Sequence, residues 1–211
     1  MNFKLNSLFA LSLSALSLPL FAQQASTIET REPEAATGVV QKHLVAGDKY
    51  MVAAANPYAS QAGRAILAQG GSAVDAAIAT QLVLTLVEPQ SSGIGGGTFM
   101  MYYNKANNKL TSFDGRETAP LAATPTLFQD GSGAPLKFFD AVVGGRSVGV
   151  PGTPALMERA HQKWGNQNWA SLFEDGIALA AGGFDVSERL AGMIARDADR
   201  LVRFGGTSGY F

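Results

Sequence analysis

The alternation of apolar and polar residues divides the chain from residue 50 onward into short helices and strands. Residues 57–68 carry apolar side chains at helical spacing, and residues 76–87 are apolar on nearly all sides, which predicts a deeply buried second helix. Asn56 and Ser72 stand where N-caps are expected, and Gly70–Gly71 separates the two segments. The pattern therefore predicts two consecutive helices.

Shorter apolar runs predict strands. Residues 50–55 form one such run, which indicates a buried strand before the first helix. Residues 98–103 and 109–113 flank a polar loop, and this arrangement is typical of a hairpin. Residues 142–143 and 147–150 are two further strand candidates.

The C-terminal part of the chain is predicted to be helical. Three helices are expected, one ending near residue 164, one over residues 169–181 and one ending near residue 201, followed by a loop over residues 205–209. The predicted N-caps of the three helices are Thr153, Asn168 and Ser187.

The N-terminal residues have a different pattern. Residues 8–21 are almost wholly apolar or serine, follow Lys4 and lead to Ala22, which is typical of a secretory signal peptide over residues 1–22. The apolar run is too short for a membrane span, so none is expected. Residues 23–48 are polar and irregular, and we expect a flexible mature N-terminus there. These features predict a periplasmic or secreted protein.

Composition narrows the possible partners. The formal net charge is −1, so the chain provides no basic field for nucleic acid. It contains no cysteine and so cannot form a disulfide framework. His43 and His161 lie far apart, and no group of residues has metal-ligand spacing. We expect no metal and no cofactor.

Two glycine motifs match catalytic or binding patterns incompletely. The run 93–98 has the outline of a dinucleotide fingerprint, but Thr98 replaces the third glycine and the run precedes a strand instead of a helix. The run 145–149 fits the nucleophile elbow of serine hydrolases, with Ser147 as the nucleophile. That elbow needs a helix directly after the serine, and residues 150–152 interrupt it. A serine at a strand edge is the preferred interpretation.

A third arrangement combines Ser91–Ser92 and the glycines of residues 93–97 with Arg116 beyond the predicted hairpin. Consecutive glycines cost backbone entropy and are tolerated where something must approach the chain closely. A guanidinium offers a planar fork of donors that suits a carboxylate. The alternative is a surface arginine held by Asp114 and Glu117. The residues alone leave both interpretations open.

Five segments in series resemble the large subunit of the gamma-glutamyltransferases, also called gamma-glutamyltranspeptidases or glutathione hydrolases. They are residues 50–53, 70–77, 88–97, 114–120 and 147–153. The resemblance implies an α+β fold of the N-terminal nucleophile hydrolase type, an αββα sandwich with two stacked sheets between helical layers. It also implies that residues 49–211 are a partial large-subunit domain, so that only the N-terminal portion of the sandwich is present.

The resemblance implies a specific chemistry. Family precursors cleave themselves, and the new N-terminal threonine of the small subunit attacks the γ-glutamyl group of glutathione and passes it to water or amino acids. The α-amino group of such a threonine can act as its own base. The arginine of the family's Asp-Gly-Arg-Glu motif grips the substrate α-carboxylate, and this role falls on Arg116. The chain contains no matching threonine segment, so we expect no catalytic residue in it.

The expected partners are therefore glutathione, other γ-glutamyl compounds and the small-subunit portion of the same precursor, and the chain by itself is expected to be an inactive fragment. Two alternatives stay open. One is an acylase or amidase precursor of the same superfamily, whose substrate would have no α-carboxylate for Arg116 to bind. The other is a non-catalytic, truncated exported module. Strand edges left unpaired would make the isolated chain poorly soluble.

Overall fold

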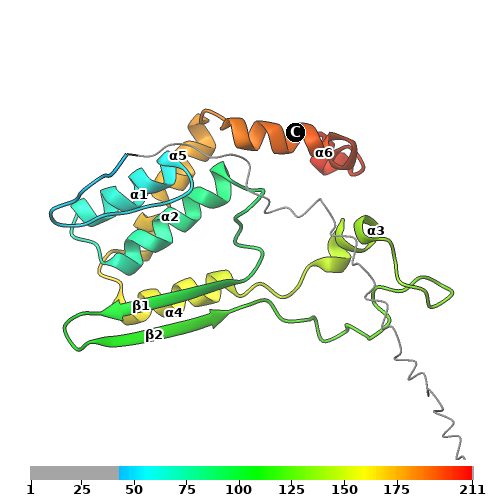
Figure 1. Cartoon of the computed structure of the whole chain (residues 1–211), viewed down its shortest axis with the longest axis horizontal. Helices are drawn as coiled ribbons and strands as arrows, with labels where there is room; N and C mark the ends of the chain where they lie inside the picture. Colours follow the sequence, from blue (N-terminus) through cyan, green and yellow to red (C-terminus); the bar gives the residue numbers. More distant parts are fainter. Residues whose placement is uncertain (1–42, 211) are drawn as a thin grey trace, which may run out of the picture. The chain divides into compact units, whose positions relative to one another are not determined.

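The computed structural model describes residues 43–210, so the predicted signal peptide and most of the predicted flexible N-terminus lie outside the described residues. The described part consists of short helices and one hairpin (Figure 1). In chain order the elements are α1 (Pro57–Ala68), α2 (Ala73–Val87), β1 (Thr98–Asn104), β2 (Lys109–Gly115), α3 (Phe138–Val142), the 3-10 turn η1 (Gly145–Ser147), α4 (Thr153–Trp164), the 3-10 turn η2 (Trp169–Phe173), α5 (Glu174–Gly182), α6 (Glu188–Leu201) and α7 (Gly205–Ser208).

The two first helices begin and end where the sequence predicts. The Asn56 side chain accepts a hydrogen bond from the backbone N–H of Tyr58, and Ser72 forms a reciprocal capping box with Asp75. Gly70 adopts a φ of +84° between the helices, a conformation that glycine reaches without steric cost. Both predicted caps are confirmed.

Helix α2 is the centre of the packing. It contacts α1, α4, η2 and α5 (Figure 1). Its buried apolar side chains divide between two clusters. One includes Val74 and Ile78 with Met157 of α4 and Leu172 of η2, and the other contains Val83 with Ala59 of α1. The predicted deep burial of this helix is confirmed for the face that carries these residues.

Strands β1 and β2 form the predicted antiparallel hairpin, with Thr98 opposite Gly115 and Asn104 opposite Lys109. Alternate side chains point to opposite faces of the hairpin. Met100 and Tyr102 pack against the first cluster, and the Tyr102 ring stacks on Trp164 of α4 with centroids 4.1 Å apart. The inner face of the hairpin is therefore held by α4.

Three strand predictions are wrong. Residues 50–55 form no strand and are half-buried or exposed, because no strand among residues 43–210 pairs with them. Residues 142–150 form the end of α3, the turn η1 and one isolated bridge between Val150 and Thr118. An apolar run becomes a strand only when a neighbour accepts its backbone hydrogen bonds.

The C-terminal helices follow the predictions with three corrections. The helix expected over residues 169–181 is the 3-10 turn η2 followed by α5. Asn168 and Ser187 cap η2 and α6 through their side chains, as expected. Thr153 does not cap α4. It is the first helical residue, Gly152 occupies the cap position, and the Thr153 hydroxyl bonds elsewhere. Residues 205–208 form the single helical turn α7 instead of a loop.

The described residues form a mixed α and β structure with one two-stranded sheet. The second stacked sheet of the predicted sandwich stays a prediction. Between residues 43 and 210, no helix has the length and apolar character needed to cross a bilayer.

Candidate functional site

Arg116 follows directly on the last residue of β2. The hairpin register places Gly115 opposite Thr98, so the glycine loop that precedes β1 lies beside Arg116. A Cβ atom on Gly97 would lie 2.8 Å from both the Arg116 Cα and the Glu117 backbone nitrogen. Real side chains do not tolerate such distances, so glycine is required at position 97 for this close approach.

A third segment joins the same place. The Gly96 carbonyl accepts hydrogen bonds from the backbone N–H groups of Gly152 and Thr153, at 3.1 and 3.2 Å. It also accepts one from the Thr153 hydroxyl at 3.0 Å. Thr118 and Val150 pair through a short antiparallel bridge. We call this cluster the motif junction: residues 93–97, 116–118 and 149–153.

The Arg116 guanidinium is accessible at the motif junction. Its side chain is 62% exposed, and its Nε lies 3.1 Å from Oε2 of Glu117. Asp114 accepts a hydrogen bond from the Arg116 backbone N–H, not from the guanidinium. The guanidinium carbon also lies 6.0 Å from the centre of the Phe99 ring. An exposed ion pair of this kind is weak, so an incoming carboxylate can compete with Glu117 for the fork of donors.

A buried carboxylate supports the loop that leads into the junction. Glu88 is 3% exposed and accepts hydrogen bonds from Asn56, Gln90, Ser187 and Arg189. Burial alone would raise the pKa of Glu88, but the hydrogen bonds, that from Asn56 foremost, outweigh it and lower the pKa below the ordinary value.

Arg189 extends this link to the serines that precede the glycines. Its second guanidinium nitrogen donates to the Ser91 hydroxyl at 2.8 Å, while Gln81 of α2 donates to the Ser92 hydroxyl at 2.7 Å. The role of Glu88 was not predicted from the sequence. The sequence feature that could have indicated this role is a charged residue at the end of an otherwise apolar helix.

The other candidates from the sequence lie apart from this chemistry. The Ser147 hydroxyl donates to the backbone carbonyls of Val142 and Gly144. His161 lies instead against Asp75, with its Nε2 3.5 Å from a carboxylate oxygen and 2.9 Å from the Gln167 carbonyl. Residues 148–152 contain no helix, so the geometry of a nucleophile elbow is not formed.

Asp75 is structural. It is fully buried, and one oxygen accepts hydrogen bonds from the backbone N–H groups of Ser72, Asn166 and Gln167. Across residues 43–210 no group of three or more metal-ligating side chains comes together. A cavity of about 680 Å³ lies between β2 and α4, and Arg116 is not among the residues that line it.

The fold matches, over part of their length, solved structures of gamma-glutamyltranspeptidases and of an acylase. The chain belongs to the gamma-glutamyltranspeptidase family, whose model matches residues 59–211.

Individual relatives agree with this assignment. The chain is 39% identical to a glutathione hydrolase proenzyme of Bacillus subtilis (strain 168) over 96% of its own length and 33% of that protein. It matches a gamma-glutamyltranspeptidase of Helicobacter pylori with a TM-score of 0.75 and 32% identity, over 80% of this chain and 48% of that one. A cephalosporin acylase of Bacillus halodurans matches with a TM-score of 0.64 and 31% identity, over 81% and 31% of the two chains.

The chain spans about a third of the length of the Bacillus subtilis relative. The resemblance found in the sequence is therefore confirmed at the level of the family. The role of Arg116 stays a prediction.

Proposed function

We propose that this chain forms part of the donor pocket of an exported gamma-glutamyltransferase, a glutathione hydrolase, and that Arg116 binds the α-carboxylate of the γ-glutamyl substrate. The acyl group would pass to water or to an amino acid from a threonine that the small-subunit portion of the same precursor supplies. That portion is then the partner of this chain, and the chain by itself is inactive.

The observation that carries this proposal is the motif junction. Three segments far apart in the sequence meet there, and the residue that they expose is an arginine whose guanidinium contacts Glu117 in an exposed ion pair and lies near the Phe99 ring. A guanidinium can bind both oxygens of a carboxylate at once, and contacts of this kind are worth about 1.5–3 kcal/mol. Such a residue suits the recognition of an amino-acid-like substrate.

The test is the substitution Arg116→Lys in a protein that carries this chain together with the remaining family sequence. Lysine keeps the charge but loses the planar fork, so we expect the KM for γ-glutamyl-p-nitroanilide to rise about tenfold. Arg146→Lys is the matched control, because Arg146 is also exposed and its guanidinium makes one long contact with the Leu127 carbonyl. Equal KM values for Arg116→Lys and the unchanged protein would reject the assignment.

A second candidate is supported by the match to the cephalosporin acylase. In that case the substrate is an amide of a different acyl group, and Arg116 has no α-carboxylate to bind. Comparing γ-glutamyl-p-nitroanilide with a glutaryl amide separates the two. We expect the γ-glutamyl compound to be preferred, and we expect Arg116→Lys to reduce that preference. A preference for the glutaryl amide that is insensitive to position 116 would favour the acylase.

We also propose that the protein is exported to the periplasm or secreted after cleavage behind Ala22. The support is the signal-peptide pattern of residues 1–22, which lie outside the described residues. N-terminal sequencing of the mature protein from an extracytoplasmic fraction should begin at Gln23. A mature protein that retains Met1 in the cytoplasm would contradict export.

A further inference from the structure

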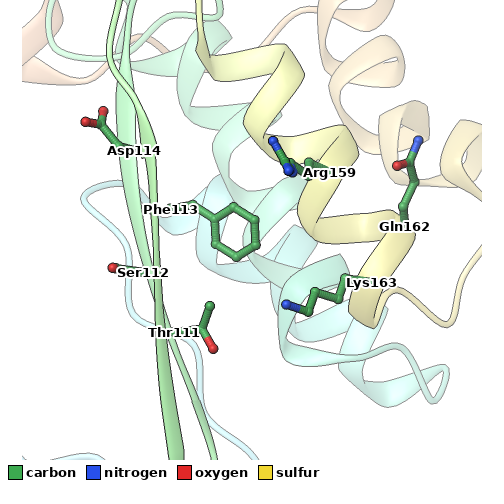
Figure 2. Close-up of a pocket in the computed structure, with 7 residues that line it drawn as sticks. All are labelled: Thr111, Ser112, Phe113, Asp114, Arg159, Gln162 and Lys163. Carbon is green, nitrogen blue, oxygen red and sulfur yellow. The ribbon is translucent and has the colours of Figure 1, made fainter.

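The cavity between β2 and α4 has an unusual lining. Four consecutive residues of β2, Thr111–Asp114, border it on one side, and Arg159, Gln162 and Lys163 of α4 border it on the other (Figure 2). Side chains along a strand alternate between its two faces, so a cavity bordered by four consecutive residues runs along the strand's edge. The volume of about 680 Å³ is open space beside that edge.

Among residues 43–210, no strand pairs with this edge of β2. The opposite edge is paired along its whole length with β1, and within residues 43–210 the sheet has no third strand. A free edge presents unpaired backbone N–H and carbonyl groups, which are a template for another strand. The cavity is thus a groove with hydrogen-bonding groups along one wall.

The other wall carries two cations. Arg159 and Lys163 are four residues apart on α4 and so lie on one side of the helix, and Figure 2 shows both extending toward the strand. Both are exposed, and neither forms an ion pair with any residue from 43 to 210. The Lys163 ammonium lies 4.7 Å from the Trp164 ring and 5.9 Å from the Phe113 ring, which fixes its position above the groove.

The spacing of the two cations along α4 matches the spacing of alternate side chains along a strand. Residues four apart on a helix are separated by about 6 Å along its axis. Residues two apart on a strand share a face and are separated by about 6.6 Å. A strand in the groove could therefore place carboxylates at positions i and i+2 opposite Lys163 and Arg159. Asp114 is the one acidic residue in the lining. In Figure 2 its side chain points away from α4, and its carboxylate already accepts a hydrogen bond from the Arg116 backbone N–H.

We propose that the free edge of β2 and the adjoining side of α4 form a docking groove for an extended, acidic polypeptide segment, which adds to the hairpin as a third strand. The backbone of β2 supplies the hydrogen bonds, and Arg159 and Lys163 select a segment with two acidic side chains on its helix-facing side. The groove is separate from Arg116, so this proposal does not depend on the proposed function.

The test uses the fluorescein-labelled peptide Thr-Val-Glu-Val-Glu-Val-Thr and the full chain, with binding followed by fluorescence anisotropy. Two control peptides carry lysine in place of both glutamates or proline in place of the central valine. The double substitution Arg159→Glu with Lys163→Glu should weaken binding of the acidic peptide about tenfold and strengthen binding of the lysine peptide. The double substitution Lys105→Glu with Arg203→Glu makes the same charge change elsewhere and should leave both affinities unchanged.

Amide hydrogen exchange gives an independent readout that needs no variant. The acidic peptide should slow exchange at backbone amides of Thr111–Asp114, and the proline peptide should not. The proposal is overturned if acidic and lysine peptides bind equally, if neither binds saturably, or if β2 exchange does not change. It is also overturned in favour of a second copy if the unchanged chain forms a dimer that the Arg159→Glu, Lys163→Glu variant abolishes.

Discussion

Arg116 is positioned by backbone geometry more than by its own side-chain contacts. It follows the last paired residue of β2, and Gly97 lets the glycine loop approach it closely. Its ion pair with Glu117 joins two neighbouring residues on an exposed turn, which contributes little to stability. The guanidinium can therefore exchange Glu117 for a ligand without loss of the fold.

Gly97→Ala tests the close approach. A Cβ at this position would meet backbone atoms of Arg116 and Glu117, which cannot move as a flexible side chain does. We expect the free energy of unfolding in urea to fall by about 1–3 kcal/mol. Gly95→Ala is the control, because no heavy atom lies within 4 Å of its added Cβ. An equal loss of unfolding free energy in both variants would show that the close backbone approach is not what requires glycine at position 97.

Glu88 makes stability depend on pH. Because its pKa is lowered in the folded protein, its contribution is fully present above the ordinary value of 4.5 and is lost as pH falls through the lowered value. We expect Glu88→Gln to lower the free energy of unfolding by about 1–3 kcal/mol at pH 7, because the amide cannot accept all four hydrogen bonds.

The difference between Glu88→Gln and the unchanged chain should then shrink as pH falls below 4.5. Asp130, whose pKa is lowered by its hydrogen bonds with Ser132 and Ala134, titrates in both chains and cancels in the difference. Urea unfolding of both chains across this range is the measurement. A difference that does not vary with pH would exclude Glu88 as the titrating group.

At the scale of the elements, local signals were sufficient for the helices. Asn56, Ser72 and Ser187 cap their helices because capping involves only the next few residues. Strands depend on distant partners, and the prediction for residues 50–55 failed for that reason. Thr153 resembles a cap in the sequence, but its hydroxyl bonds Gly96, 57 positions away. The convergence at the motif junction is equally non-local. The glycines and Arg116 left two interpretations open, and the family resemblance favoured the one in which Arg116 binds a carboxylate.

Asp75 connects two elements, and its removal should weaken both. Its carboxylate accepts hydrogen bonds from backbone N–H groups at the start of α2 and in the loop after α4. Loss of the carboxylate would leave these partly buried donors unpaired. We expect Asp75→Ala to lower the free energy of unfolding by about 3 kcal/mol. Glu158→Ala, an exposed carboxylate on α4, should change it by less than about 0.5 kcal/mol. Similar small effects of both substitutions would contradict this role.

At the scale of the whole molecule, the hairpin has one covered and one uncovered face. Phe99, Met101 and Tyr103 of β1 are 64%, 71% and 54% exposed, while Met100 between them packs on the core. Met101→Lys should therefore raise the solubility of the chain without lowering its free energy of unfolding. Met100→Lys should lower that free energy by at least about 2 kcal/mol. A monomeric, freely soluble unchanged chain would contradict the importance of this face.

We expect Arg116 to bind the α-carboxylate of a γ-glutamyl compound through both of its outer guanidinium donors. A crystal structure of a protein that carries this chain and the remaining family sequence, with glutamate bound, tests it most directly. We predict both guanidinium donors about 2.7–2.9 Å from the two α-carboxylate oxygens, with Glu117 displaced from its present contact. A bound glutamate whose α-carboxylate is held by other residues, while Arg116 stays paired with Glu117, would contradict it.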